Sequence, residues 1–320
     1  MIGEFDLIKS YFSDLQELSP GLVLGIGDDA AVVNVPADQQ LVVATDTLVS
    51  GVHFPEDLDP GYIAARTLLT NLSDLAAMGA EPRWFTLALT LPESNPDWLQ
   101  RFSEGLAKAA RQYRCSLIGG DTTRGPLTVT IAIHGVVPKG AALTRSGAQV
   151  GDLVFVSGQP GKGAAGLAAV LGQLEGLAAE QYQQLVDYFV GPVPRLALGV
   201  QLRNLASATI DVSDGLLADL GHICRLSGVG AELSLEALPL LSTVSGIAVQ
   251  QLQQWVLSGG DDYELCFTVP ESAVGELAQI AKDTDTPVHR IGRIIEGNGV
   301  YCLDSHNKKV STHSNGYSHF

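Results

Sequence analysis

The sequence predicts an α+β protein built from two domains. Its 320 residues are enough for two packed domains, and 46% hydrophobic with 17% charged residues is typical of a globular chain. Apolar runs typical of strands alternate with amphipathic stretches typical of helices along the whole length. The stretch SGAQVGD interrupts this pattern near Gly147 to Gly151, so we place the domain boundary between residues 147 and 148.

The first domain, residues 1–147, is predicted to combine partly antiparallel strands with covering helices. Apolar residues from Phe5 to Leu18 have helical spacing, and Pro20 then ends that segment. Two further helices are expected at Tyr62–Met78, which Gly79 ends, and at Trp98–Arg114. Strands are expected at residues 22–26, 30–35, 41–46, 83–91, 115–120 and 127–137.

The second domain, residues 148–320, is predicted to alternate strand and helix, which favours an α/β or α+β architecture. Strands are expected at residues 153–157, 208–211, 231–235, 263–269, 288–294 and 300–303. Helices are expected in the Gly/Ala-rich stretch after the first of these strands, around Tyr182 and Leu196, and at residues 215–227, 250–257 and 272–281.

Composition excludes several function classes. A net charge of −16 and a pI near 4.7 argue against nucleic-acid binding, because phosphate backbones are held mainly by Lys and Arg. Neither a signal peptide nor an apolar run of membrane-spanning length is found, so we expect no membrane contact and a cytoplasmic location. The cysteines form no CxxC pair and are predicted to be reduced core thiols. They are Cys115, Cys224, Cys266 and Cys302.

Six short segments with aspartate stand beside apolar runs or in glycine turns. They are GIGDDAAVV, ATDTLVSGVHF, NLSDLAAMGA, IGGDTTRG, IDVSDGLLADL and SGGDDYEL. Carboxylates spread over a whole chain cannot form a local calcium loop, but folding can bring them into one site for several hard cations. Divalent ions held in this way are the usual means by which an acidic protein handles polyphosphate.

In the first domain each acid also has a plainer interpretation. Asp28 and Asp29 follow a glycine turn that lets a ligand approach the backbone, but Gly-Asp-Asp is also a common surface turn. Asp46 is expected at the end of a buried strand, where a cation or a helix cap would offset its burial. Asp74 is equally well an exposed helical acid. His53 follows Asp46 closely enough to face the same cavity.

The later segments repeat this chemistry. Asp121 follows two glycines and an apolar strand, which resembles a corner for phosphate and metal. Asp211 and Asp214 flank an expected helix start, where Ser213 and Asp214 could cap free N–H groups and Ser213 is a candidate nucleotide contact. Capping explains one of these acids but hardly both. Asp262, with Asp261, forms a third turn of the same type after Gly259-Gly260. One shared site explains all six segments most economically.

Familiar nucleotide motifs are absent. Gly161-Lys162 lacks both the Ser or Thr and the earlier glycine of a P-loop, so a structural strand-to-helix turn is the better interpretation. No GxGxxG stands between a strand and a helix, and no EF-hand loop occurs.

These segments together resemble the bacterial thiamine-monophosphate kinase family. The resemblance runs from GEFDLI at Gly3 to the terminal GYSHF, and LTRSGAQVGD is a further marker. It implies the two-domain α/β architecture of the aminoimidazole-ribonucleotide synthetase type, with an N-terminal mixed sheet and a C-terminal α/β domain. It also implies a homodimer joined through the N-terminal domains, and ATP bound between the two domains of each subunit.

The resemblance also implies roles for individual residues. The implied magnesium ligands are Asp29, Thr45, Asp46, Asp74, Asp121, Asp211 and Asp214, with Asp28 nearby. The implied nucleotide contacts are Gly120, Asp121, Arg145 and Ser213. The implied substrate contacts are His53, Asp262 and Tyr317, with Phe320 as the alternative aromatic in the tail. Asp261 stands where relatives are expected to carry Glu.

The implied reaction moves the γ-phosphoryl group of ATP in line onto the phosphate of thiamine monophosphate, with several Mg²⁺ ions as cofactors and ATP as co-substrate. The acceptor phosphate is largely ionised near neutrality, so no catalytic general base is expected. One alternative is another ATP-dependent enzyme of the same superfamily; a selenophosphate synthetase would want a reactive thiol near the N-terminus, whereas the first cysteine here is Cys115. The other is a non-catalytic acidic metal-binding protein.

Overall fold

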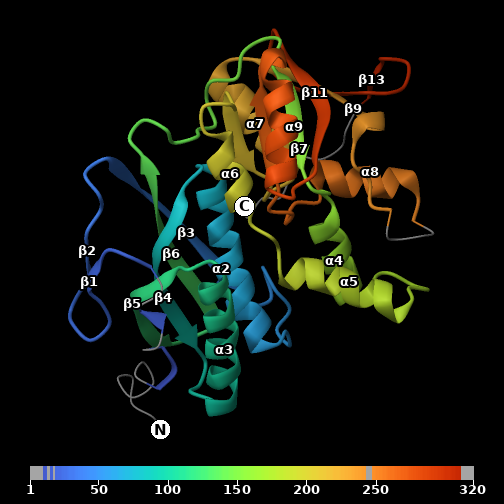
Figure 1. Cartoon of the computed structure of the whole chain (residues 1–320). Coiled ribbons are helices and arrows are strands. Elements are labelled where there is room, and N and C mark those ends of the chain that lie inside the picture. The colour runs from blue at the N-terminus through green and yellow to red at the C-terminus, as the bar shows by residue number, and fades with distance from the viewer. Residues whose placement is uncertain (1–9, 13–14, 17–18, 243–246, 311–320) are drawn as a thin grey trace. The chain divides into compact units, whose positions relative to one another are not determined.

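The computed structural model describes residues 10–12, 15–16, 19–242 and 247–310, and the chain forms two compact units (Figure 1). Unit 1 comprises Met1–Leu75 and Ala80–Gly140, and unit 2 comprises Ala76–Gly79 and Ala141–Phe320. Most of the helix expected from Phe5 to Leu18 lies outside the described residues, as do Tyr317 and Phe320. The assignment of metal binding, ATP binding and dimerisation to the N-terminal domain stays a prediction.

Unit 1 is built on a four-stranded mixed sheet in the order β3-β6-β4-β5. Its strands are β3 (Gln39–Val49), β4 (Glu81–Leu91), β5 (Ser116–Arg124) and β6 (Thr128–Pro138), and a separate pair consists of β1 (Leu22–Leu24) and β2 (Val32–Val33). β6 pairs antiparallel with both β3 and β4, whereas β4 and β5 are parallel. Alternate residues of β6, Val129, Ile131 and Ile133, are fully buried, so one face of the sheet belongs to the core.

Two helices, α2 (Pro60–Ala77) and α3 (Pro96–Gln112), lie along the buried face (Figure 1). α3 begins where the sequence offers a helix start: the Asn95 side chain accepts hydrogen bonds from the N–H groups of Asp97 and Trp98, and Pro96 opens the first turn. Its apolar stripe is buried. The opposite face of the sheet leaves Leu41 and Val43 exposed.

Unit 2 is built on a seven-stranded sheet in the order β13-β12-β9-β11-β7-β10-β8. Its strands are β7 (Leu153–Ser157), β8 (Ala208–Asp211), β9 (Gly230–Ser234), β10 (Leu265–Val269), β11 (Val288–Ile295), β12 (Gly299–Leu303) and β13 (Lys309–Val310). Every pair is antiparallel except β12 with β9. The protein is therefore α+β in both units, which confirms the predicted class.

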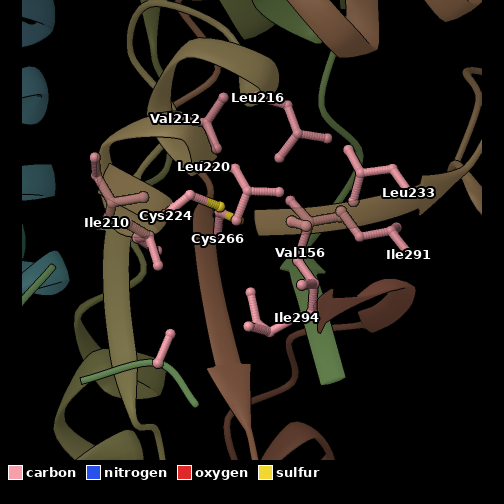
Figure 2. Packing of buried hydrophobic residues seen from close by; sticks show 14 of the residues in the cluster. Val156, Ile210, Val212, Leu216, Leu220, Cys224, Leu233, Cys266, Ile291 and Ile294 are labelled. Carbon is pink, nitrogen blue, oxygen red and sulfur yellow. The ribbon is translucent and has the colours of Figure 1, made fainter. Parts of the chain in front are cut away.

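Helices cover both faces of this second sheet. They are α4 (Lys162–Val170), α5 (Ala179–Val190), α6 (Leu196–Leu202), α7 (Leu216–Ser227), α8 (Val249–Ser258) and α9 (Val274–Asp283), with short 3₁₀ turns at Leu235–Ala237 and Glu271–Ala273. Val154 and Val156 of β7 pack with α7 and α8 (Figure 2), whereas Leu153 and Phe155 pack with α6 and α9. The strand is apolar throughout because both of its faces are buried.

All four cysteines are free and buried, as expected for core thiols. Burial raises the pKa of the thiols of Cys224 and Cys302 to about 11, so they stay protonated at neutral pH. In the part of the chain that the structure describes, every helix is too short or too polar to cross a membrane.

Candidate active site

The structure brings two of the aspartate segments of unit 1 together around a cavity of about 980 Å³. One wall is the glycine turn that carries Asp28 and Asp29, and the other is the middle of β5 with Gly120 and Asp121. Four of the residues singled out from sequence therefore lie at one place, although ninety residues of chain separate the two segments. The cavity is a candidate for part of a nucleotide site.

Local geometry explains why glycines stand at both walls. Gly27 has a φ of +118°, in the region that favours glycine, and Gln16 fixes the turn by accepting a hydrogen bond of 2.8 Å from the N–H of Ile26. On the other wall, a Cβ at Gly120 would overlap the carbonyl oxygen of Leu87. The register between β4 and β5 shifts just before this point, so β5 passes close to its neighbour only because a side chain is missing.

The charge of the cavity has one sign. The side chains of Asp28, Asp29 and Asp121 are exposed, and no Lys, Arg or His stands among the described residues that line the cavity. Asp28 accepts a hydrogen bond of 2.9 Å from the N–H of Asp29, which leaves most of its lone pairs open. Such a surface attracts cations and repels bare polyphosphate.

Four other predicted residues of unit 1 do not line this cavity. They are Thr45, Asp46, His53 and Asp74. The prediction that Asp46 ends a strand is wrong: β3 continues to Val49, because β6 pairs with it residue by residue up to Thr128. Thr45 is exposed and Asp46 is half-buried, with its N–H donated to the side-chain oxygen of Asn71 on α2 at 3.1 Å.

His53 has a local hydrogen bond. Its Nδ1 accepts the N–H of Val49 at 3.0 Å, which fixes the ring against the end of β3 and keeps Nδ1 unprotonated. Its predicted contact with the substrate stays a prediction.

In unit 2 the segment Val212–Gly215 forms a turn between β8 and α7, and a buried carboxylate holds it. One oxygen of Asp219 accepts the N–H groups of Ser213, Asp214 and Gly215, each at 3.1 Å. The predicted caps are wrong, because α7 is capped by Gly215 without any side-chain hydrogen bond. Asp219, in the first turn of the helix, supplies the acceptor instead.

A second aspartate segment of unit 2 joins this turn through its main chain. The N–H of Asp261 donates to the carbonyl of Ser213 at 2.7 Å, and that of Tyr263 donates to the carbonyl of Val212 at 2.9 Å. A Cβ at Gly260 would lie 2.6 Å from the carbonyl oxygen of Ser213, so only glycine allows this close approach. The segments IDVSDG and SGGDDYEL are thus one structural element.

The side chain of Asp262 accepts hydrogen bonds from the main chain of the protein. It is 9% exposed, and its carboxylate accepts the N–H groups of Gly161 at 2.8 Å and Gly163 at 3.0 Å. These contacts hold the turn before α4, which is the structural strand-to-helix turn predicted in place of a P-loop. The predicted substrate contact of Asp262 stays a prediction, and these hydrogen bonds leave it little free capacity.

Arg145 lies on an exposed loop anchored at both ends within unit 2. The carbonyl of Thr144 accepts the N–H of Thr209 at 2.8 Å, and the N–H of Gly147 donates to the hydroxyl of Ser227 at 3.1 Å. The pKa of His222 is lowered by burial, then by Arg225 and Arg145, and raised by Asp214. Arg145 and Asp214 therefore share one electrostatic neighbourhood.

Buried acids in unit 2 carry strongly shifted pKa values. Burial, together with Asp211 and Asp214, raises the pKa of Asp219 to about 8, although the N–H groups of Asp214 and Ser213 oppose the shift. Burial also raises the pKa of Asp262 well above its ordinary value, against the N–H groups of Gly161 and Gly163. Burial therefore favours the protonated form of both groups relative to an exposed carboxylate.

The donor set fits magnesium only in combination with a ligand. Within the described ranges, no three His, Cys, Asp or Glu side chains are placed so that they could hold a metal ion. Magnesium, however, is usually bound by one or two carboxylates together with substrate phosphates and water, rather than by a cage of protein ligands. Exposed carboxylates around a cavity without cationic residues meet that requirement.

Sequence reasoning missed Asp219. Its place inside the expected helix of residues 215–227 made it look like an ordinary helical acid. The available signal was an acid in the first turn of a helix that follows the tight turn Ser213-Asp214-Gly215, where free N–H groups need an acceptor.

Comparisons with known proteins cover both units. The family described as AIR synthase related protein, N-terminal domain, matches residues 27–137, and AIR synthase related protein, C-terminal domain, matches residues 149–304. A thiamine-monophosphate kinase of Escherichia coli O157:H7 is 47% identical to this chain over 319 residues, which is 99% of this chain and 98% of that protein.

Solved structures agree. A thiamine-monophosphate kinase from Stenotrophomonas maltophilia K279a is 44% identical, with a TM-score of 0.85 over 93% of this chain and 94% of that one. A structure described as AaThiL complexed with AMPPCP and TMP is 31% identical, with a TM-score of 0.77 over 100% of this chain and 97% of that one.

Proposed function

The chain belongs to the thiamine-monophosphate kinase family and is a kinase that acts on thiamine monophosphate with ATP, and we propose that it transfers the γ-phosphoryl group directly and in line, assisted by several magnesium ions. The bond between the γ-phosphorus and the bridging oxygen breaks, an oxygen of the acceptor phosphate forms the new bond, and ADP leaves with thiamine diphosphate as the product. The observation that carries this proposal is the cavity of unit 1, with three exposed carboxylates and no cation among its described lining residues.

Charge repulsion is the main barrier that this reaction must overcome. Two dianionic phosphates about 4 Å apart repel by roughly 16 kcal/mol at an effective dielectric constant near 20, four times the figure for unit charges. Bound magnesium supplies charge neutralisation and a template for the in-line approach. Asp29 and Asp121, with Asp28 nearby, would hold the metal together with ATP in unit 1, and Asp211 and Asp214 would do so in unit 2.

The remaining predicted site residues would bind and orient the nucleotide. Gly120 offers a backbone without a side chain, so phosphate can approach closely. Arg145 and Ser213 would contact the nucleotide, Arg145 from its anchored loop and Ser213 from the turn Val212–Gly215 that Asp219 holds. Because the acceptor is already ionised, no side chain has to remove a proton.

We also propose that the protein is a homodimer joined through the open face of the four-stranded sheet. Leu41 is 43% and Val43 is 56% exposed on β3, and a second copy would cover them. Light scattering at micromolar concentration tests this, since Leu41→Glu combined with Val43→Glu should give monomers if the proposal is right.

The decisive assay is phosphorus NMR of the protein with MgATP and thiamine monophosphate, beside a panel of other phosphorylated acceptors. Growth of diphosphate signals with thiamine monophosphate alone supports the proposed function. Turnover of another acceptor in its place, or nucleotide binding that does not depend on magnesium, would contradict it.

Direct transfer has its own test. Incubation with γ-labelled ATP in the absence of acceptor should leave the protein unlabelled. A labelled aspartyl-phosphate would show a covalent intermediate and refute the direct route.

A further inference from the structure

Asp219 is a buried acid outside the residues predicted for the site, and it holds a turn that carries two of them. It is 2% exposed, and its Oδ2 atom accepts three successive backbone N–H groups, those of Ser213, Asp214 and Gly215. Two of them, Ser213 and Asp214, carry the side chains that are expected to meet nucleotide and metal. A carboxylate that gathers three peptide groups fixes the direction in which the side chains between them project.

The position of Asp219 is itself fixed by packing. Leu216, Leu220 and Cys224 form the buried stripe of α7, at spacings of four residues, and pack with Val212 and Cys266 (Figure 2). This stripe sets the rotation of α7 about its axis. Because the N–H of Asp219 also donates to the carbonyl of Gly215 at 3.0 Å, the acid is bound to the turn through both its main chain and its side chain.

The shape of the turn also depends on a glycine and on the segment after α8. Gly215 has a φ of +116°, and a Cβ there would lie 2.9 Å from the Cα of Ser258. On the carbonyl side, Val212 and Ser213 accept N–H groups from the segment after α8. Without the oxygen of Asp219, three buried or half-buried N–H groups would lose their acceptor, and the turn would relax toward water.

We propose that Asp219 is a positioning residue for the phosphoryl transfer: its carboxylate holds the turn Ser213–Gly215 so that the side chains of Ser213 and Asp214 are aimed at nucleotide and metal. This inference rests on the proposed function. It assigns Asp219 no contact with substrate.

The test measures binding without turnover. Mn²⁺ binding in the presence of AMPPCP is followed by electron paramagnetic resonance, in which the signal of free Mn²⁺ falls as the ion binds. Removing a group that orients metal ligands typically costs 10- to 100-fold in affinity, so Asp219→Ala should weaken Mn²⁺ binding by about 30-fold. Asp219→Asn keeps an accepting oxygen and should weaken it by only about threefold.

Asp152 provides the matched control in the same unit. It is 6% exposed and accepts the N–H of Gln149 at 2.9 Å and the hydroxyl of Ser207 at 2.5 Å, none of which is a predicted site residue. Asp152→Ala should lower the melting temperature and leave Mn²⁺ affinity unchanged. If Asp219→Ala behaves in the same way, Asp219 is merely structural and the proposal is overturned.

Two further measurements keep the result clear. If Asp219→Ala does not fold, Asp219→Glu replaces it: one added methylene displaces the carboxylate, and we expect about tenfold weaker Mn²⁺ binding, whereas wild-type affinity in both the Glu and Asn variants overturns the proposal. Turnover of thiamine monophosphate by the wild-type protein is assayed in parallel. Its absence would count against the proposed function, independently of the effect of Asp219 on binding.

Discussion

Aspartates stand in or near glycine turns in both unit 1 and unit 2, yet the structure uses them differently. In unit 1, Asp28, Asp29 and Asp121 are exposed at a cavity. In unit 2, Asp219 and Asp262 are buried, and their side-chain oxygens accept hydrogen bonds from backbone N–H groups. A Gly-Asp turn in a sequence therefore indicates either an open ligand or a main-chain acceptor, and burial decides which.

The difference follows from what surrounds each turn. In unit 1 the acids stand on a loop and at the outer strand of a four-stranded sheet, where their side chains are exposed to water. In unit 2 the turns lie against helices that cover both faces of a seven-stranded sheet, so an acid there needs donors from the main chain. Exposed acids should thus act on activity directly, whereas buried acids should act through the turns that they hold, on stability and on the side chains that those turns carry.

The largest expected effect is on activity, in unit 1. Asp121→Asn keeps the shape of the side chain but removes its charge, and turnover should fall at least about a hundredfold because a metal-binding carboxylate is lost. Steady-state rates at saturating magnesium measure this, with the melting temperature as the control for folding. Near-normal turnover would remove Asp121 from the ligand set.

Next comes stability, in unit 2. Asp262→Ala leaves the N–H groups of Gly161 and Gly163 without their acceptor, and the free energy of unfolding should fall by about 2–3 kcal/mol. Urea unfolding monitored by tryptophan fluorescence measures the loss. The idea that Asp262 is a main-chain acceptor fails if the midpoint does not move.

A pH dependence sharpens the contrast. The pKa of Asp219 is about 8 in the folded protein because of burial and of Asp211 and Asp214, above its ordinary value of 3.8. The folded state therefore binds the proton more tightly, and this contribution to stability is lost as pH rises from about 4 through 8, by at most about 1.4 kcal/mol per pH unit.

Thermal unfolding at a series of pH values in EDTA should show this decline in the wild type and a flatter profile in Asp219→Asn. An equal slope in both proteins would mean that Asp219 does not titrate in that window.

The smallest effect is expected at the surface of unit 1. Asp28→Asn leaves an oxygen to accept the N–H of Asp29, and the free energy of unfolding should change by less than about 0.5 kcal/mol. Calorimetry that shows a larger loss would mean that the glycine turn depends on the charge, as the turns of unit 2 do.

Elements were predictable from sequence where local patterns decide them. Alternation in β6, the helical pattern from Trp98 in α3 and the glycine that follows α2 are all local signals, and each element is present. Asp46 shows where local signals end. Whether β3 stops at residue 46 or continues to Val49 depends on its pairing with β6, about eighty residues away.

The chemistry of the candidate site was predictable, but which acids face a ligand and which accept main-chain hydrogen bonds was not. The sequence gathers glycines and acids, and the structure does place Asp28, Asp29 and Asp121 around one cavity. The sequence could not indicate that Asp262 accepts the N–H groups of a turn a hundred residues earlier. Nor could it indicate that Asp219, rather than Ser213, accepts the free N–H groups at the start of α7. Those partners are set by how α4 and α7 pack.

The hydrogen bonds of the turn Val212–Gly215 should slow the exchange of its amide hydrogens with solvent. Its amide hydrogens point at one buried oxygen while its carbonyls hold the segment that leads into β10, so no single peptide group can open to solvent alone. Residues 212–215 and 260–263 should therefore exchange as one cooperative unit, at a common rate set by the lifting of α7. A ligand that slows exchange in residues 212–215 should therefore slow exchange in residues 260–263 as well.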